Sequence, residues 1–127
     1  MYWTELKNQY LIRLETGEKV VETLQNLASK MEVGVASIQG IGGVRELSYG
    51  IFDESKKSYR IEKFNDFAEL LSLNGSISWY KSTPFAHLHF SAINTNQRLV
   101  SGHLFECTTA ITIELFLTHF DTKVERE

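Results

Sequence analysis

Nearly every apolar stretch of this chain alternates with polar residues at every second position, which is the spacing of a β-strand. The clearest case is residues 109–120, where one face would carry Ile111, Ile113, Leu115 and Leu117. Residues 20–31 are the exception, because their apolar side chains recur at helical spacing opposite a polar face. Thr16-Gly17 offers a start for this helix and Gly34 a stop. The sequence therefore predicts an α/β fold of the α+β type, in which one amphipathic helix packs on a mostly antiparallel mixed sheet.

Turn-forming residues divide the remaining strand candidates. Asn74-Gly75 is the strongest two-residue hairpin signal, because both residues tolerate the positive φ of a type I′ turn. Gly40-Ile41-Gly42-Gly43 is interpreted as a glycine turn and not as a phosphate loop, since a strand-like segment follows it where a helix would be needed. The predicted helix can serve as a crossover between the strands on either side of it. The predicted strands are residues 10–14, 33–39, 44–53, 59–64, 67–73, 76–80, 85–93 and 99–105.

Length and composition limit what the chain can be. A chain of 127 residues with 43% hydrophobic residues builds one core, and no linker or repeat divides it, so residues 1–127 are predicted to form a single domain. The net charge of −3 argues against a stand-alone DNA-binding protein, which needs a basic surface. The single cysteine, Cys107, excludes an internal disulfide. With no signal peptide and no apolar run near the roughly 20 residues of a membrane span, we expect a cytoplasmic protein without a membrane partner.

Three of the four histidines fall in one predicted hairpin. His87 and His89 are two residues apart on a strand and so project from the same face. Counting from the middle of the loop at residues 94–98 places His89 opposite a residue near 103, which brings His103 to the pair at cross-strand Cβ separations of roughly 5 Å. Three neutral imidazoles on one rigid surface can hold a divalent ion, zinc by default, and leave a position open for water or substrate. The alternative is that all three are half-buried structural histidines held by hydrogen bonds.

The sequence gives weaker support for a role of other residues in metal binding or catalysis. A cupin site also needs a glutamate a few residues after its HxH motif, where this chain has residues 91–94, none of them acidic. Cys107 is interpreted as a buried core residue and His119 as an exposed histidine. Glu69 and Glu114 are candidates to accept a hydrogen bond from the N–H of a metal-bound imidazole. They could equally well form ion pairs at the solvent-exposed surface. The sequence names no catalytic residue.

The order of these motifs resembles the PPC domain, the plants-and-prokaryotes-conserved domain that stands alone in bacteria and archaea and is attached to AT-hooks in plants. The resemblance spans roughly residues 10–117. This chain has no Arg-Gly-Arg-Pro hook, and Ser101 replaces a glycine that is common before Gly-His-Leu. The resemblance is carried by Gly17-Glu18, Gly40 to Gly43, residues 69–75, Pro84 to His89, Ser101 to Leu104 and Glu114.

The resemblance implies a homotrimer in which the three histidines form a metal site near the subunit interfaces. A trimer would also cover aromatic residues that we expect on exposed faces, namely Trp79, Tyr80, Phe90 and Phe116. The resemblance further implies transcriptional regulation, through weak contact with DNA or through a regulatory protein partner. The alternative is a metal-dependent enzyme, a hydrolase or a lyase that uses the open coordination position. Such an enzyme needs a general base, for which Glu69 and Glu114 are the acidic candidates.

Overall fold

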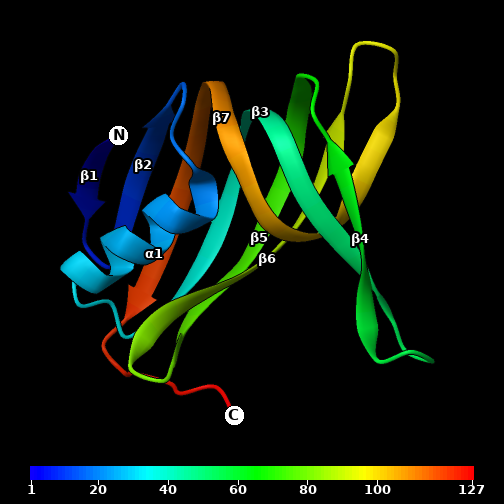
Figure 1. Ribbon diagram of the computed structural model, residues 1–127. Helices are drawn as coiled ribbons and strands as arrows, with labels where there is room; N and C mark the ends of the chain where they lie inside the picture. Colours follow the sequence, from blue (N-terminus) through cyan, green and yellow to red (C-terminus); the bar gives the residue numbers. More distant parts are fainter.

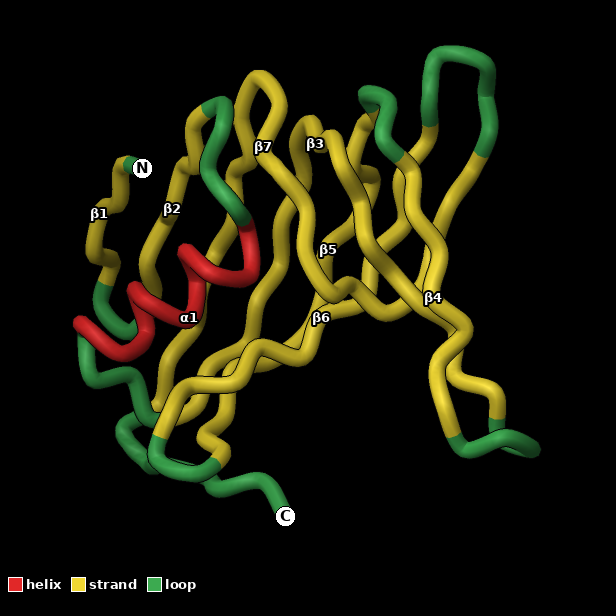
Figure 2. Tube along the Cα trace, in the orientation of Figure 1, coloured by secondary structure: helices red, strands yellow, loops and turns green.

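The structure of the protein is a computed structural model that describes residues 1–127. It contains a single helix and seven strands (Figure 1, Figure 2). The helix α1 spans Val20–Lys30, within the predicted segment. At 11 residues it is too short to cross a bilayer. The strands are β1 Tyr2–Leu6, β2 Gln9–Glu15, β3 Val35–Asp53, β4 Ser58–Phe64, β5 Ala68–Tyr80, β6 Thr83–Ile93 and β7 Leu99–Phe120.

The seven strands form one antiparallel sheet that curls until it closes on itself. Its order is β1-β2-β7-β6-β5-β3-β4, and a further pairing joins β3 to β7. Because β2 and β3 both run antiparallel to β7, they are parallel to each other, and α1 is the crossover between them. Figure 1 shows α1 lying across the sheet, while the β3–β4 hairpin projects from the other side of the molecule. The predicted fold class, one helix on a mostly antiparallel sheet, is confirmed.

Two predicted interruptions of strands are absent. Gly40 to Gly43 lies inside β3, where a bulge between Gly40 and Gly42 shifts the register against β5. Residues 99–105 and 109–120 are likewise parts of one strand, β7. The pairing of β7 with β3 shifts register around Ile111, which has a φ of +65° and an exposed side chain. Ile111 was therefore wrongly placed in the apolar row, which consists of Ile113, Leu115 and Leu117.

The predicted hairpin turn at Asn74-Gly75 is also wrong, because both residues lie inside β5. Gly75 is paired on both sides, with Ile38 of β3 and Leu88 of β6. A β-carbon on Gly75 would overlap the carbonyl oxygen of His87. The glycine therefore serves the close approach of two backbones and not a reversal of the chain.

The start of α1 is held by a residue of β7. The N-cap residue forms no side-chain hydrogen bond, so the start signal expected at Thr16-Gly17 does not supply the cap. Instead, the Glu106 carboxylate accepts hydrogen bonds from the backbone N–H groups of Val21 at 2.7 Å and Glu22 at 3.0 Å. Its negative charge also suits the positive end of the helix dipole. The helix is thereby tied to β7 three residues beyond His103.

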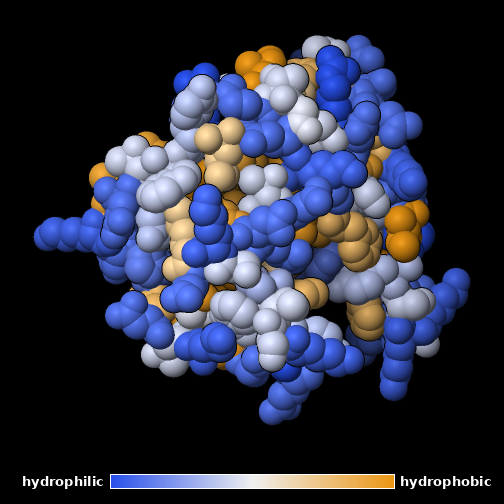
Figure 3. Space-filling model, turned by 60° about the vertical axis from the view of Figure 1, so that its left-hand side comes forward, coloured by the Kyte–Doolittle hydropathy of each residue, from blue (hydrophilic) through white to orange (hydrophobic).

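Apolar side chains from α1 and from the inner face of the sheet form one core of 28 buried residues. Cys107 belongs to this core, as predicted. Of the aromatic residues expected on exposed faces, Trp79 and Phe90 are buried, whereas Tyr80 and Phe116 are exposed. On the face shown in Figure 3, hydrophobic residues reach the surface in separate patches among hydrophilic ones.

Candidate metal centre

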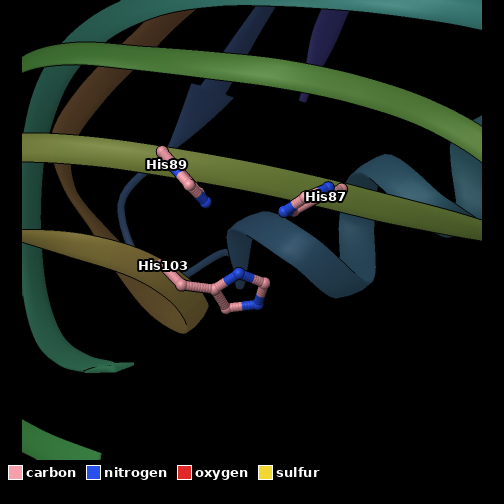
Figure 4. Close-up of side chains that lie close together, drawn as sticks. All are labelled: His87, His89 and His103. Atoms are coloured by element: carbon pink, nitrogen blue, oxygen red, sulfur yellow. The ribbon is translucent and has the colours of Figure 1, made fainter. Parts of the chain in front are cut away.

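The three histidines of the β6–β7 hairpin converge on one point. His89 lies directly opposite His103 in the register of the two strands, as the loop count predicted. Figure 4 shows His87 and His89 extending from β6 toward the ring of His103 on β7. The ring centroids are 5.2 Å apart for His87 and His89, 5.2 Å for His87 and His103, and 5.6 Å for His89 and His103. One ring nitrogen from each residue lies within 4.8 Å of the other two.

Two glycines set the backbone positions of these histidines. Gly75 allows β5 to lie against the peptide of His87, as described above. Gly102, which precedes His103, has a φ of +150° that side-chain-bearing residues rarely adopt. A β-carbon there would lie 2.6 Å from the carbonyl oxygen of Gly50 on β3. In the folded protein, close backbone contacts on both sides of the hairpin therefore fix the position of the cluster within the sheet.

The environment of the cluster favours the neutral form of two of its imidazoles. Burial lowers the pKa of His87, and the positive charges of Arg126 and of His89 lower it further. Burial likewise lowers the pKa of His103, with added effects from His87, His89 and Arg126. Neutral imidazole is the form that binds metal ions, so these shifts extend the pH range in which the cluster can act as a ligand set.

The distances suit a metal ion after small rotations of the rings. A tetrahedral zinc ion with Zn–N distances of about 2.1 Å separates its ligand nitrogens by about 3.4 Å. Rotation about the side-chain bonds can close the remaining gap without moving the strands. Beside the rings lies an open cavity of about 250 Å³, which leaves one side of such an ion accessible. Its lining residues are Asn74, Gly75, Ser76, His87 and His89.

Tyr59 is the side chain outside the cluster that comes closest to forming a hydrogen bond with it. Its hydroxyl lies 3.5 Å from Nδ1 of His103, and the two ring centroids are 4.8 Å apart. Tyr59 belongs to β4, on the projecting β3–β4 hairpin. No sequence motif points to Tyr59, because 44 positions separate it from His103. No local spacing signals a contact between segments that only the closed sheet brings together.

The last residues of the sequence are attached to the sheet by backbone hydrogen bonds. The backbone N–H of Trp79 donates to the carbonyl of Val124 at 2.8 Å, and that of Arg126 donates to the carbonyl of Trp79 at 2.6 Å. These bonds bring Arg126 to the row of side chains that contains His87. Its guanidinium carbon lies 4.7 Å from the centroid of the Phe85 ring.

The two predicted acidic neighbours do not reach the histidines. Glu69 pairs with Ile93, four residues along β6 from His89, which is about 13 Å of strand. Glu114 lies eleven residues along β7 from His103, beside β2. Both side chains are exposed and form no hydrogen bond with an imidazole. The sequence predicts which face of the sheet each glutamate occupies, but not how far along the strands it lies from the histidines.

His119 is outside the cluster and is not the exposed residue that we expected. It is half-buried and stacks on Tyr10, with ring centroids 5.2 Å apart. Its Nε2 atom is buried without a hydrogen-bond partner. It lies at the far end of β7, sixteen residues from His103.

Comparison with known proteins identifies one family of domains. The family model of the Plants and Prokaryotes Conserved (PCC) domain matches residues 4–121. The match covers all three clustered histidines. Among curated proteins, none matches.

Solved structures share the fold over nearly the whole chain. A plant- and prokaryote-conserved (PPC) protein from Pyrococcus horikoshii is 30% identical with a TM-score of 0.87, over 99% of this chain and 87% of that one. A metal-containing protein from Archaeoglobus fulgidus is 28% identical with a TM-score of 0.87, over 99% and 90% of the two chains. A candidate DNA-binding protein from Ralstonia eutropha JMP134 is 25% identical with a TM-score of 0.92, over 98% and 87%.

Proposed function

The chain belongs to the Plants and Prokaryotes Conserved domain family, abbreviated PCC or PPC, and on that premise we propose that it is a binding and assembly domain built around a three-histidine metal centre. The observation that carries the proposal is the convergence of His87, His89 and His103, with one ring nitrogen of each within 4.8 Å of the others. The similarity to a metal-containing protein from Archaeoglobus fulgidus supports it.

Zinc is the ion that we expect in this centre. Imidazole is a preferred ligand of zinc, and three such ligands with an open fourth position form a common zinc site. Nickel, copper and iron also accept imidazole ligands, so the donor set favours zinc without excluding them. When bound, the ion would supply a Lewis acid at the open side of the cluster.

The proposed assembly is a homotrimer. Apolar side chains stand exposed on the projecting β3–β4 hairpin, among them Ile51, Phe52 and Ile61. Two further hollows in the surface are lined by a second set of exposed apolar residues, Ile41, Leu71, Ile111 and Phe116. Surfaces of this kind gain stability when another chain covers them. Light scattering should give three times the mass of one chain, and a stable monomer at micromolar concentration would contradict this assembly.

The proposed biological role is regulation of transcription, through weak contact with DNA or through a regulatory protein. The candidate DNA-binding protein from Ralstonia eutropha supports a link to DNA. The net charge of −3 opposes tight binding to phosphates. Fluorescence anisotropy with a labelled duplex should therefore show weak binding that falls steeply between 50 and 200 mM salt. Tight binding at physiological salt would show that direct contact with DNA is the main function.

The experiment that tests the metal centre is elemental analysis of the purified protein after incubation with equimolar zinc and removal of free ion. We expect about one zinc per chain in the wild-type protein. Less than a tenth of that amount would contradict the proposal. The trimer can be tested separately, because its interface is not required to contain zinc.

A metal-dependent hydrolase or lyase is the second candidate function. It is favoured by the open cavity beside His87 and His89 and by the hydroxyl of Tyr59 near His103. Zinc-loaded protein can be assayed for hydrolysis of 4-nitrophenyl acetate and for decarboxylation of oxaloacetate. Rates that do not exceed those of a His103→Ala variant would contradict catalysis of either class of reaction.

A further inference from the structure

Arg126 has no carboxylate partner, although acidic residues outnumber basic ones in this chain. The three ion pairs of the structure do not involve it. Its main chain is nevertheless held in place, since its N–H donates to the carbonyl of Trp79 and the neighbouring Val124 accepts from Trp79. The structure thus fixes the position of a residue whose charged group is left free.

The guanidinium of Arg126 continues the row of side chains that forms the metal centre. Phe85, His87 and His89 alternate along β6 and so share one face of the strand. The Arg126 guanidinium carbon lies 4.7 Å from the centroid of the Phe85 ring. Neighbours on one face of a strand are about 7 Å apart. The guanidinium therefore packs on the aromatic ring that neighbours His87 on this face.

The charge of Arg126 acts on the cluster itself. A cation on the face of β6 that carries the imidazoles opposes the binding of a divalent metal ion. An anion between the two positive centres would remove that repulsion and be attracted by both of them. The planar guanidinium group can donate two parallel hydrogen bonds to the paired oxygens of a carboxylate or phosphate group.

We propose that the metal centre takes a small anionic ligand, a carboxylate or a phosphate, with one end bound by the Arg126 guanidinium and the other at the open side of the metal ion. This inference rests on the proposed metal centre and names the class of molecule that it binds. Phe85, on which the guanidinium packs, and His87 are neighbours about 7 Å apart on one face of β6, which favours a small anion over a large one.

The test uses isothermal titration calorimetry on the zinc-loaded protein, with oxalate and inorganic phosphate as probes and neutral oxamide as a control. We expect at least one of the two anions to bind and oxamide not to bind. An Arg126→Gln variant should weaken binding of that anion tenfold or more. An Arg126→Lys variant should give an intermediate loss, because lysine keeps the charge but not the fork. Zinc retained after each titration is measured to show that the anion has not extracted the metal.

Lys123 provides a matched control within the same segment. Its ammonium lies 4.0 Å from the centroid of the Trp79 ring, whereas the Arg126 guanidinium stacks on Phe85, beside the histidines. A Lys123→Gln variant removes one positive charge and should change the affinity for the anion less than twofold. Equal losses in the Lys123 and Arg126 variants would show that only the overall charge matters, which would contradict the inference.

Zinc binding is measured first, so that the two proposals can fail separately. A wild-type protein that binds no zinc overturns the metal centre, and the anion site falls with it. A wild-type protein that binds zinc but neither anion overturns the anion site alone. The same conclusion holds if Arg126→Gln binds the anion as tightly as wild type. The Arg126→Gln protein should bind zinc at least as tightly as wild type when no anion is present, because the substitution removes a repelling charge.

Discussion

The carbonyl oxygen of His87 occupies the space that a side chain on Gly75 would need. The two residues lie on adjacent strands, and Gly75 is also paired on its other side with Ile38 of β3. Any β-carbon at position 75 must therefore push β6 and its histidines away from β5.

A Gly75→Ala variant should lose about 1–3 kcal/mol of unfolding free energy, the usual cost of adding a methyl group where there is no room. It should also bind zinc at least tenfold more weakly, because the displaced strand carries His87 and His89. Urea denaturation and zinc titration measure the two effects. The matched control is Glu69→Ala, an exposed position on the same strand, which should leave zinc affinity unchanged. An alanine at position 75 with wild-type zinc affinity would contradict this account of the site.

A His103→Ala variant should retain less than about a tenth of the zinc that the wild-type protein binds, because two imidazoles hold an ion far less tightly than three. The core does not include His103, so circular dichroism should show an unchanged fold. His119→Ala is the control, since that residue lies at the far end of β7. Full zinc occupancy in the His103 variant would indicate that the cluster is structural.

A Tyr59→Phe variant should weaken zinc binding about tenfold, the scale on which residues behind metal ligands act. The substitution keeps the ring that stacks on His103 and removes only the hydroxyl 3.5 Å from Nδ1. Tyr80→Phe is a matched control, because both tyrosines are 40% exposed. If the two variants bind zinc equally well, the hydroxyl of Tyr59 does not orient His103.

The metal-free protein should become less stable as the pH falls below about 6.5, the ordinary pKa of histidine. Burial and neighbouring positive charges lower the pKa of His87 and His103 in the folded state, so the unfolded chain binds protons first. Stability is therefore complete above the ordinary pKa and declines as the pH falls toward the lowered one. Urea denaturation at pH 7.5 and 5.5 measures this loss. A double variant, His87→Gln with His103→Gln, should show a smaller loss, and an equal loss would assign the effect to other groups.

A Glu106→Gln variant should lose about 1–2 kcal/mol, because its carboxylate satisfies the first free N–H groups of α1 and carries the charge that suits the helix dipole. Thermal or urea denaturation measures the loss. Glu114→Gln, also on β7 but exposed and without a hydrogen bond, should change stability by less than about 0.5 kcal/mol. Equal midpoints for the two variants would show that Glu106 does not hold the helix.

The parts of the site that depend on local spacing could be predicted from the sequence. His89 and His103 flank one short loop, so counting residues was enough to place them opposite each other. The turn predicted at Asn74-Gly75 is wrong because a glycine needed for close packing and a glycine needed for a turn look alike in sequence. Tyr59 and Arg126 could not be found, because only the closure of the sheet and the attachment of the last residues bring them to the histidines.

The three histidines lie within residues 87–103, whereas closing the sheet requires pairs as distant in sequence as Val35 and Phe120. A hairpin forms in about 1–10 μs, while pairing of distant strands is much slower. The ligand set can therefore assemble in a chain that is still mostly unfolded. A metal ion bound at that stage stabilises the folding transition state nearly as much as the native state, so added zinc would speed folding more than it slows unfolding. The ion would then promote folding of the chain as well as bind to the native protein.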